Sequence, residues 1–71
     1  MLGIAETADI LHRFLKDCFE FWITECDKKE AWARAIADTE DCDSDPYEGK
    51  GKFDRQTKSI FIKYYKEYRG D

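Results

Sequence analysis

The chain has 71 residues, of which 42% are hydrophobic, 39% charged and 15% aromatic, and its formal net charge is −4 at pH 7. This length allows a single domain over residues 1–71 and excludes a large enzyme fold. The aromatic share favours a folded domain over intrinsic disorder, and no apolar run approaches the roughly 18 residues that a membrane helix needs.

Residues 4–23 have the periodicity of an amphipathic helix, with apolar side chains on about half of the circumference and charged side chains on the rest. The pattern fails near Thr24, which predicts a helix end or a bend. An apolar arc this wide is broader than packing on one neighbour requires. Either two neighbouring helices cover it, or part of it is a protein interface, where aromatic residues concentrate binding energy. The residues expected at this interface are Phe19, Phe21, Trp22 and, from later in the chain, Ile62.

A second helix is predicted over residues 28–39. Asp27 can cap its N-terminus, and Glu30, three residues later, completes the spacing of a capping box. The interior has high helix propensity, and its alanines allow a neighbouring helix to come close. One long bent helix over residues 4–39 is the alternative.

Residues 40–52 are predicted to form a loop, because aspartate, proline and glycine interrupt regular structure there. Residues 38–48 contain six acids and no base, which gives this acidic segment a formal charge of −6. Closely spaced carboxylates can imitate nucleic-acid phosphates, so the acidic segment is a candidate surface for inhibiting a nucleic-acid-processing protein. Its six acids are Asp38, Glu40, Asp41, Asp43, Asp45 and Glu48.

Three of these acids, Asp41, Asp43 and Asp45, stand at the first, third and fifth positions of an EF-hand-like calcium loop. The match then fails, because Pro46 stands where the loop needs glycine and Lys52 where it needs a bidentate glutamate. The pattern therefore favours a solvated loop, and weak, non-selective metal binding is the most that we expect from it.

Residues 53–69 allow two interpretations. As a helix, the segment gathers its apolar and aromatic side chains, Tyr64, Tyr65 and Tyr68 among them, on one arc that would face the core. As a β-hairpin, it would use a stretch from Ser59 to Tyr65 that is rich in strand-forming residues. The periodicity favours the helix, with Asp54 as its N-cap.

The end of the chain is basic, since residues 49–71 contain seven bases and three acids. These bases could contact nucleic-acid phosphates while tyrosines stack on bases. The helix would turn its tyrosines away from the lysines, however, and a pI of about 4.9 is far below that of a dedicated nucleic-acid binder. The residues of this alternative are Arg55, Lys58, Lys63, Lys66 and Arg69.

The cysteines and the single histidine show no pattern typical of a catalytic or zinc site. Cys18, Cys26 and Cys42 are odd in number and separated by gaps of seven and fifteen residues, unlike the close pairs of zinc sites. A disulfide scaffold is therefore not expected, which favours a reducing cytoplasm. His12 has no partner at the spacing of a nucleophile–base pair, so we expect no enzyme activity and no cofactor.

The sequence thus predicts a small all-α domain of three helices, with an α+β domain ending in a β-hairpin as the alternative. We expect a non-enzymatic, cytoplasmic accessory or regulatory protein that acts by protein–protein contact, with self-association as a further option. Its size and surface polarity resemble those of small accessory proteins of phages and mobile elements. The alternative functions are a nucleic-acid-binding module and a weak metal-binding loop.

Overall fold

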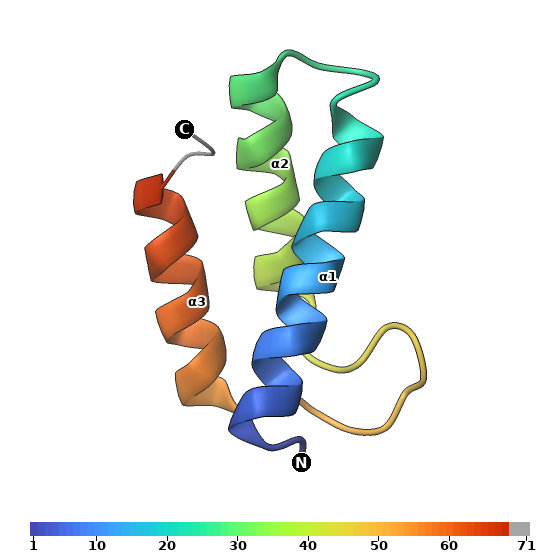
Figure 1. Cartoon of the computed structure of the whole chain (residues 1–71), viewed down its shortest axis with the longest axis vertical. Coiled ribbons are helices and arrows are strands. Elements are labelled where there is room, and N and C mark those ends of the chain that lie inside the picture. The colour runs from blue at the N-terminus through green and yellow to red at the C-terminus, as the bar shows by residue number, and fades with distance from the viewer. Residues whose placement is uncertain (69–71) are drawn as a thin grey trace.

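The computed structural model describes residues 1–68 and contains three helices, α1 (Ile4–Trp22), α2 (Lys28–Asp41) and α3 (Arg55–Tyr68). Figure 1 shows α1 and α2 running antiparallel beside each other, with α3 alongside them and parallel to α1. The predicted three-helix, all-α fold is confirmed, and the β-hairpin alternative is wrong because α3 is one continuous helix. Among the described residues, no helix combines the length and the apolar character needed to cross a membrane.

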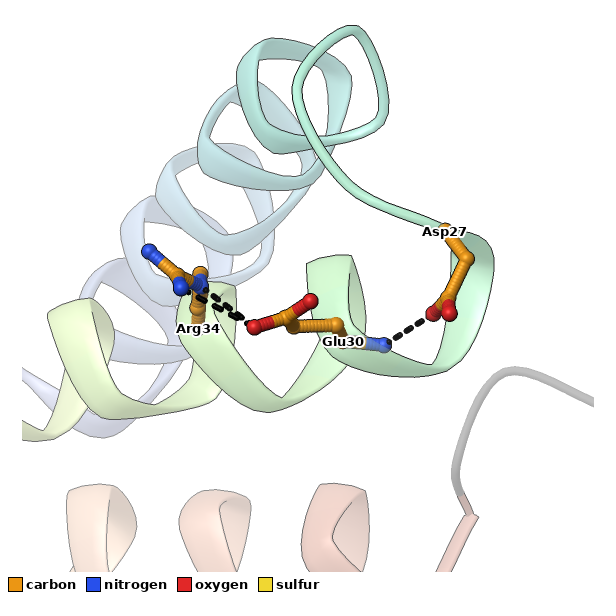
Figure 2. A network of polar contacts seen from close by, with 3 residues as sticks. All are labelled: Asp27, Glu30 and Arg34. Carbon is orange, nitrogen blue, oxygen red and sulfur yellow. Dashed lines mark hydrogen bonds and ion pairs between the residues drawn. The ribbon is translucent and has the colours of Figure 1, made fainter.

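The chain reverses between α1 and α2, so the alternative of one long bent helix is wrong. Thr24 donates its hydroxyl proton to the Phe21 carbonyl at 2.7 Å, a local bond that competes with the helical pattern. Asp27 then caps α2, since its Oδ1 accepts a hydrogen bond from the Glu30 backbone N–H at 2.8 Å (Figure 2). The Glu30 carboxylate pairs with Arg34 at 2.9 Å, one turn further on, and so only one half of the predicted capping box forms.

The core has two parts that share one aromatic side chain. Leu15, Ala35, Ile36 and Ile62 form the first part, in which the fully buried alanine allows α1 and α2 to approach closely. The second part, at the end of the molecule that holds the N-terminus and the start of α3, contains Leu2, Leu11 and Phe53. Phe61 of α3 packs against both parts and joins them.

The connection between α2 and α3 is held against the N-terminus by backbone hydrogen bonds. The Phe53 N–H donates to the Asp43 carbonyl at 3.0 Å, and the Leu2 N–H donates to the Lys52 carbonyl at 2.9 Å. Ser44 and Lys52 form an isolated antiparallel β-bridge across the same loop. These backbone hydrogen bonds hold the loop in place and so determine where α3 begins.

Asp54 ties the first turn of α3 to the first turns of α1. Its Oδ2 accepts hydrogen bonds from the Thr57 N–H at 2.9 Å and the Thr57 hydroxyl at 2.8 Å, as the predicted N-cap should. Its own backbone N–H donates at 3.1 Å to the hydroxyl of Thr7, which is fully buried in α1. The position of the start of α3 is thus fixed by hydrogen bonds as well as by packing.

The orientation of α3 about its own axis differs from the predicted one. Ile62, expected on an exposed interface, is only 7% exposed and belongs to the core, so that assignment is wrong. Tyr64 and Tyr68, expected to face the core, are 57% and 43% exposed, and Ile60 is 63% exposed. The buried face of α3 is rolled toward its basic side, where the Lys58 side chain is only 15% exposed and its Nζ lies 2.9 Å from Asp43.

Replacing Ile62 with alanine is expected to lower the free energy of unfolding by about 2–5 kcal/mol, because the change leaves a cavity between all three helices. Ile60→Ala is the matched control on the same helix and should change stability by less than about 0.5 kcal/mol. Urea unfolding followed by circular dichroism measures both values. Equal effects of the two substitutions would contradict the observed roll of α3.

Candidate functional site

Aromatic side chains from all three helices meet beside α3 and form an aromatic cluster. Phe19 of α1 packs on Trp32 of α2 with ring centroids 4.8 Å apart, and Trp32 stacks on Tyr65 of α3 at 5.9 Å. Tyr64 and Tyr68 stack on each other at 5.9 Å with an interplanar angle of 12°. Such pairs add stabilisation beyond their buried area, so the rings of the cluster support one another.

A groove of about 610 Å³ runs between α1 and α3 over this cluster, and we call it the tyrosine groove. Its floor is half-buried, whereas Tyr64 and Tyr68 stand exposed at one side. On the α1 side it carries Arg13 and Lys16, and no carboxylate lines it. The lining residues are His12, Arg13, Leu15, Lys16, Phe19, Trp32, Tyr64, Tyr65 and Tyr68.

Hydrogen-bond donors outnumber acceptors in the tyrosine groove. The indole Nε1 of Trp32 is buried and has no hydrogen-bond partner among the described residues. The Tyr65 hydroxyl lies 3.0 Å from Nδ1 of His12. Burial, followed by the neighbouring phenols of Tyr64 and Tyr68, raises the pKa of Tyr65, so its hydroxyl keeps its proton at neutral pH.

The structure brings only one of the predicted interface residues, Phe19, into the tyrosine groove. Phe21 is 59% exposed, but it packs edge-on against Trp22 and does not line the groove. Trp22 is half-buried and donates its indole proton to Asp38 at 2.8 Å, while the Arg34 guanidinium lies 4.8 Å from its ring centroid. The sequence pattern placed Tyr64 and Tyr68 in the core. The groove could be predicted only if the orientation of α3 about its own axis were known.

The acidic segment is largely engaged with the rest of the chain. Asp43 pairs with Lys58 at 2.9 Å, and Glu40 pairs with Lys66 at 2.9 Å. Asp45 is only 6% exposed, because its Oδ1 accepts hydrogen bonds from two backbone N–H groups that follow it in the loop. Glu48 pairs with Lys50 and Asp38 accepts the Trp22 indole proton, which leaves Asp41 as the one acid of the segment with no partner in residues 1–68.

These engagements also separate the three carboxylates of the candidate calcium loop. Asp43 is turned to α3, and Asp45 is turned into its own loop, where it fixes the turn that contains Tyr47. Asp41 is the last residue of α2. Within residues 1–68, no three His, Cys, Asp or Glu side chains are grouped so that they could hold a metal ion.

Four of the five predicted nucleic-acid-binding residues line a second groove, of about 620 Å³, on the α2 side of α3. Lys58 and Lys66 are paired with acids there, and Glu40 and Glu67 also line the groove. None of the tyrosines lines it, so it offers no aromatic platform for bases. The residues brought together are Arg55, Lys58, Lys63 and Lys66, and Arg69 lies outside the described residues.

The three cysteines are free thiols. Burial, together with the nearby Asp38 and Asp17 carboxylates, raises the pKa of Cys18 to about 11, so it is protonated at neutral pH and is a poor nucleophile. The Cys42 thiol donates to the Ser44 carbonyl at 3.1 Å. The Cys18 thiol therefore lacks the environment of an activated cysteine.

Acid is expected to destabilise the fold through three carboxyls whose pKa values lie below the ordinary value. A hydrogen bond from Lys58 lowers the pKa of Asp43, and backbone N–H groups lower those of Asp45 and Asp54. A lowered folded-state pKa gives stability that is present above about pH 4 and is lost as the pH falls through the folded-state value. The urea midpoint should therefore fall between about pH 5 and about pH 2.5.

In the double variant D45N/D54N, each residue keeps one side-chain oxygen to accept the hydrogen bonds but no longer titrates. The urea midpoint of this variant should therefore fall less over the same pH range. D41N, which removes the acid without a partner in residues 1–68, is the matched control and should behave like the wild type. A wild-type midpoint that does not change with pH would show that these carboxyls carry no stability.

No family model, curated protein or solved structure matches the chain. Functional inference therefore depends on the chain's own surface. In the tyrosine groove, aromatic side chains, two of them exposed, occur together with two basic side chains that form no ion pair in residues 1–68.

Proposed function

We propose that this chain is a small, non-enzymatic accessory protein that binds a partner protein in the tyrosine groove. The observation that carries the proposal is the exposure of Tyr64 and Tyr68, 57% and 43%, directly beside the half-buried rings of Phe19 and Trp32. Tyrosine and tryptophan dominate the binding energy of protein interfaces. A groove with such a lining provides the pocket that an anchoring side chain of a partner needs.

The packing of the tyrosine rings on their neighbours supports the same function. Tyr64 and Tyr68 are stacked on each other, and Tyr65 is held by Trp32 and Phe61. Side chains that are already ordered lose little conformational entropy when a partner binds. The groove is therefore prepared for contact before a partner arrives.

The acidic segment is a weaker candidate for the same role. Five of its six acids already have partners within the chain, so a protein that used them would have to replace those contacts. Inhibition of a nucleic-acid-processing protein through this segment stays a prediction. The three free thiols support a reducing compartment, such as the cytoplasm, as the place of action.

The double variant Y64A/Y68A is expected to lose partner binding while keeping the fold, because both side chains are exposed. Immobilised wild type and variant are compared for proteins captured from nuclease-treated lysate, and the dissociation constant for each purified capture should rise at least about tenfold. I60A, one turn earlier on α3, and F21A, outside the groove, are the controls. Binding that survives Y64A/Y68A but is lost in F21A would move the interface to the end of α1.

Nucleic-acid binding through the basic groove is the second candidate, favoured by the clustering of four basic residues beside α2. Arg55 and Lys63 are the two that form no ion pair in the described part of the chain. If the groove binds single-stranded nucleic acid, R55A/K63A should weaken the affinity and reduce its dependence on salt. Fluorescence anisotropy with a labelled oligonucleotide at low salt tests this, and the absence of wild-type binding would exclude the candidate.

A further inference from the structure

We propose that the occupant of the tyrosine groove is an acidic segment of a different protein, with carboxylates placed beside apolar side chains. This inference rests on the function proposed above and adds the chemistry of the partner. It is carried by three features of the groove: its charge, its hydrogen-bonding groups and the apolar side chains of its floor.

The charge of the groove is opposite to that of the chain. The whole chain has 16 acids and 12 Lys and Arg residues, but the groove lining contains Arg13 and Lys16 and no acid. Neither residue forms an ion pair in residues 1–68, whereas Arg34, Lys50, Lys58 and Lys66 each do. The Arg13 guanidinium instead lies 5.2 Å from the centroid of the Tyr47 ring. Tyr47 does not line the groove, so Lys16 offers its charge to an occupant directly, and Arg13 offers its charge once it leaves the Tyr47 ring.

The hydrogen-bonding groups lead to the same chemistry. Trp32 carries a buried Nε1–H without an acceptor among the described residues, and its ring lines both this groove and a second hollow between α2 and α3. The phenol groups of Tyr64 and Tyr68 can donate to an occupant, whereas the Tyr65 hydroxyl is shared with His12. An ionised carboxylate is the side chain that only accepts, so it complements a lining rich in donors.

The apolar floor of the groove disfavours a small inorganic anion as the occupant. Leu15, Phe19 and Trp32 line the space of about 610 Å³, which is large enough for several side chains. An acidic peptide with apolar residues can cover this floor and reach Arg13 and Lys16 at the same time. A nucleic acid fits less well, because it carries many phosphates, while the groove offers two permanent positive charges on a chain of net charge −4.

The test is selection from a short random-peptide library displayed on phage, with the full chain as target and Y64A/Y68A for counter-selection. We expect the selected peptides to be enriched in Asp and Glu next to apolar residues. Their dissociation constants should rise about tenfold or more in R13E/K16E and should also rise when NaCl is increased from about 50 to about 500 mM. R55E/K63E makes the same change of charge on the basic groove and should leave the affinity within about twofold.

Each other outcome has a definite meaning. Peptides that need Tyr64 and Tyr68 but show no acidic enrichment and no effect of R13E/K16E would overturn the inference and leave the proposed function standing. Recovery of no peptide that depends on the tyrosines would overturn both. Tighter, tyrosine-dependent binding of labelled oligothymidylate would assign the groove to nucleic acid. A wild-type dimer in light scattering that becomes a monomer in R13E/K16E would assign it to a second copy of this chain.

Discussion

Most of the contacts that fix the position of α3 lie at the N-terminal end of this helix. At its start, Asp54 caps the helix and hydrogen-bonds to the buried Thr7 hydroxyl, while Phe53 fills the core beside Leu2 and Leu11. Further along, Ile62 is the residue of α3 that is buried. α1 and α2 pack most extensively on each other, and α3 contacts the two of them less. Grooves therefore lie on both sides of α3.

The two grooves differ in chemistry because opposite faces of α3 line them. The face toward α2 carries lysines, two of which reach acids of the segment that precedes α3. The face toward α1 carries tyrosines, which stack on rings from α1 and α2. Two acids of the acidic segment, Glu40 and Asp43, are paired with α3, whereas Arg13 and Lys16 at the tyrosine groove form no ion pair within the described chain. This difference is why the tyrosine groove is the better candidate for a binding site.

Local signals in the sequence were sufficient for the elements of this fold. Periodicity predicted α1 and α3, the Asp27 and Asp54 caps marked the starts of two helices, and the lapse at Thr24 marked the end of α1. The roll of α3 could not be predicted in this way, because it is set by tertiary packing, in which Ile62 joins Leu15 and Ile36 in the core. That single error exchanged the roles of Ile62 and Tyr64. The tyrosine groove, which needs Tyr64 and Tyr68 on the surface, was therefore not predicted.

Because α3 packs less extensively than α1 and α2, a bound partner would affect the lifetime of the protein in a cell. Any molecule that fills the tyrosine groove touches α1 and α3 together and acts as an additional piece of core. By mass action, a ligand at about 100 times its dissociation constant adds about 2.7 kcal/mol to stability, a large addition for a chain of this size, whose own core supplies only a few kcal/mol. Proteases act mainly on open forms. The abundance of this chain would therefore follow the abundance of its partner, and excess copies would be degraded first.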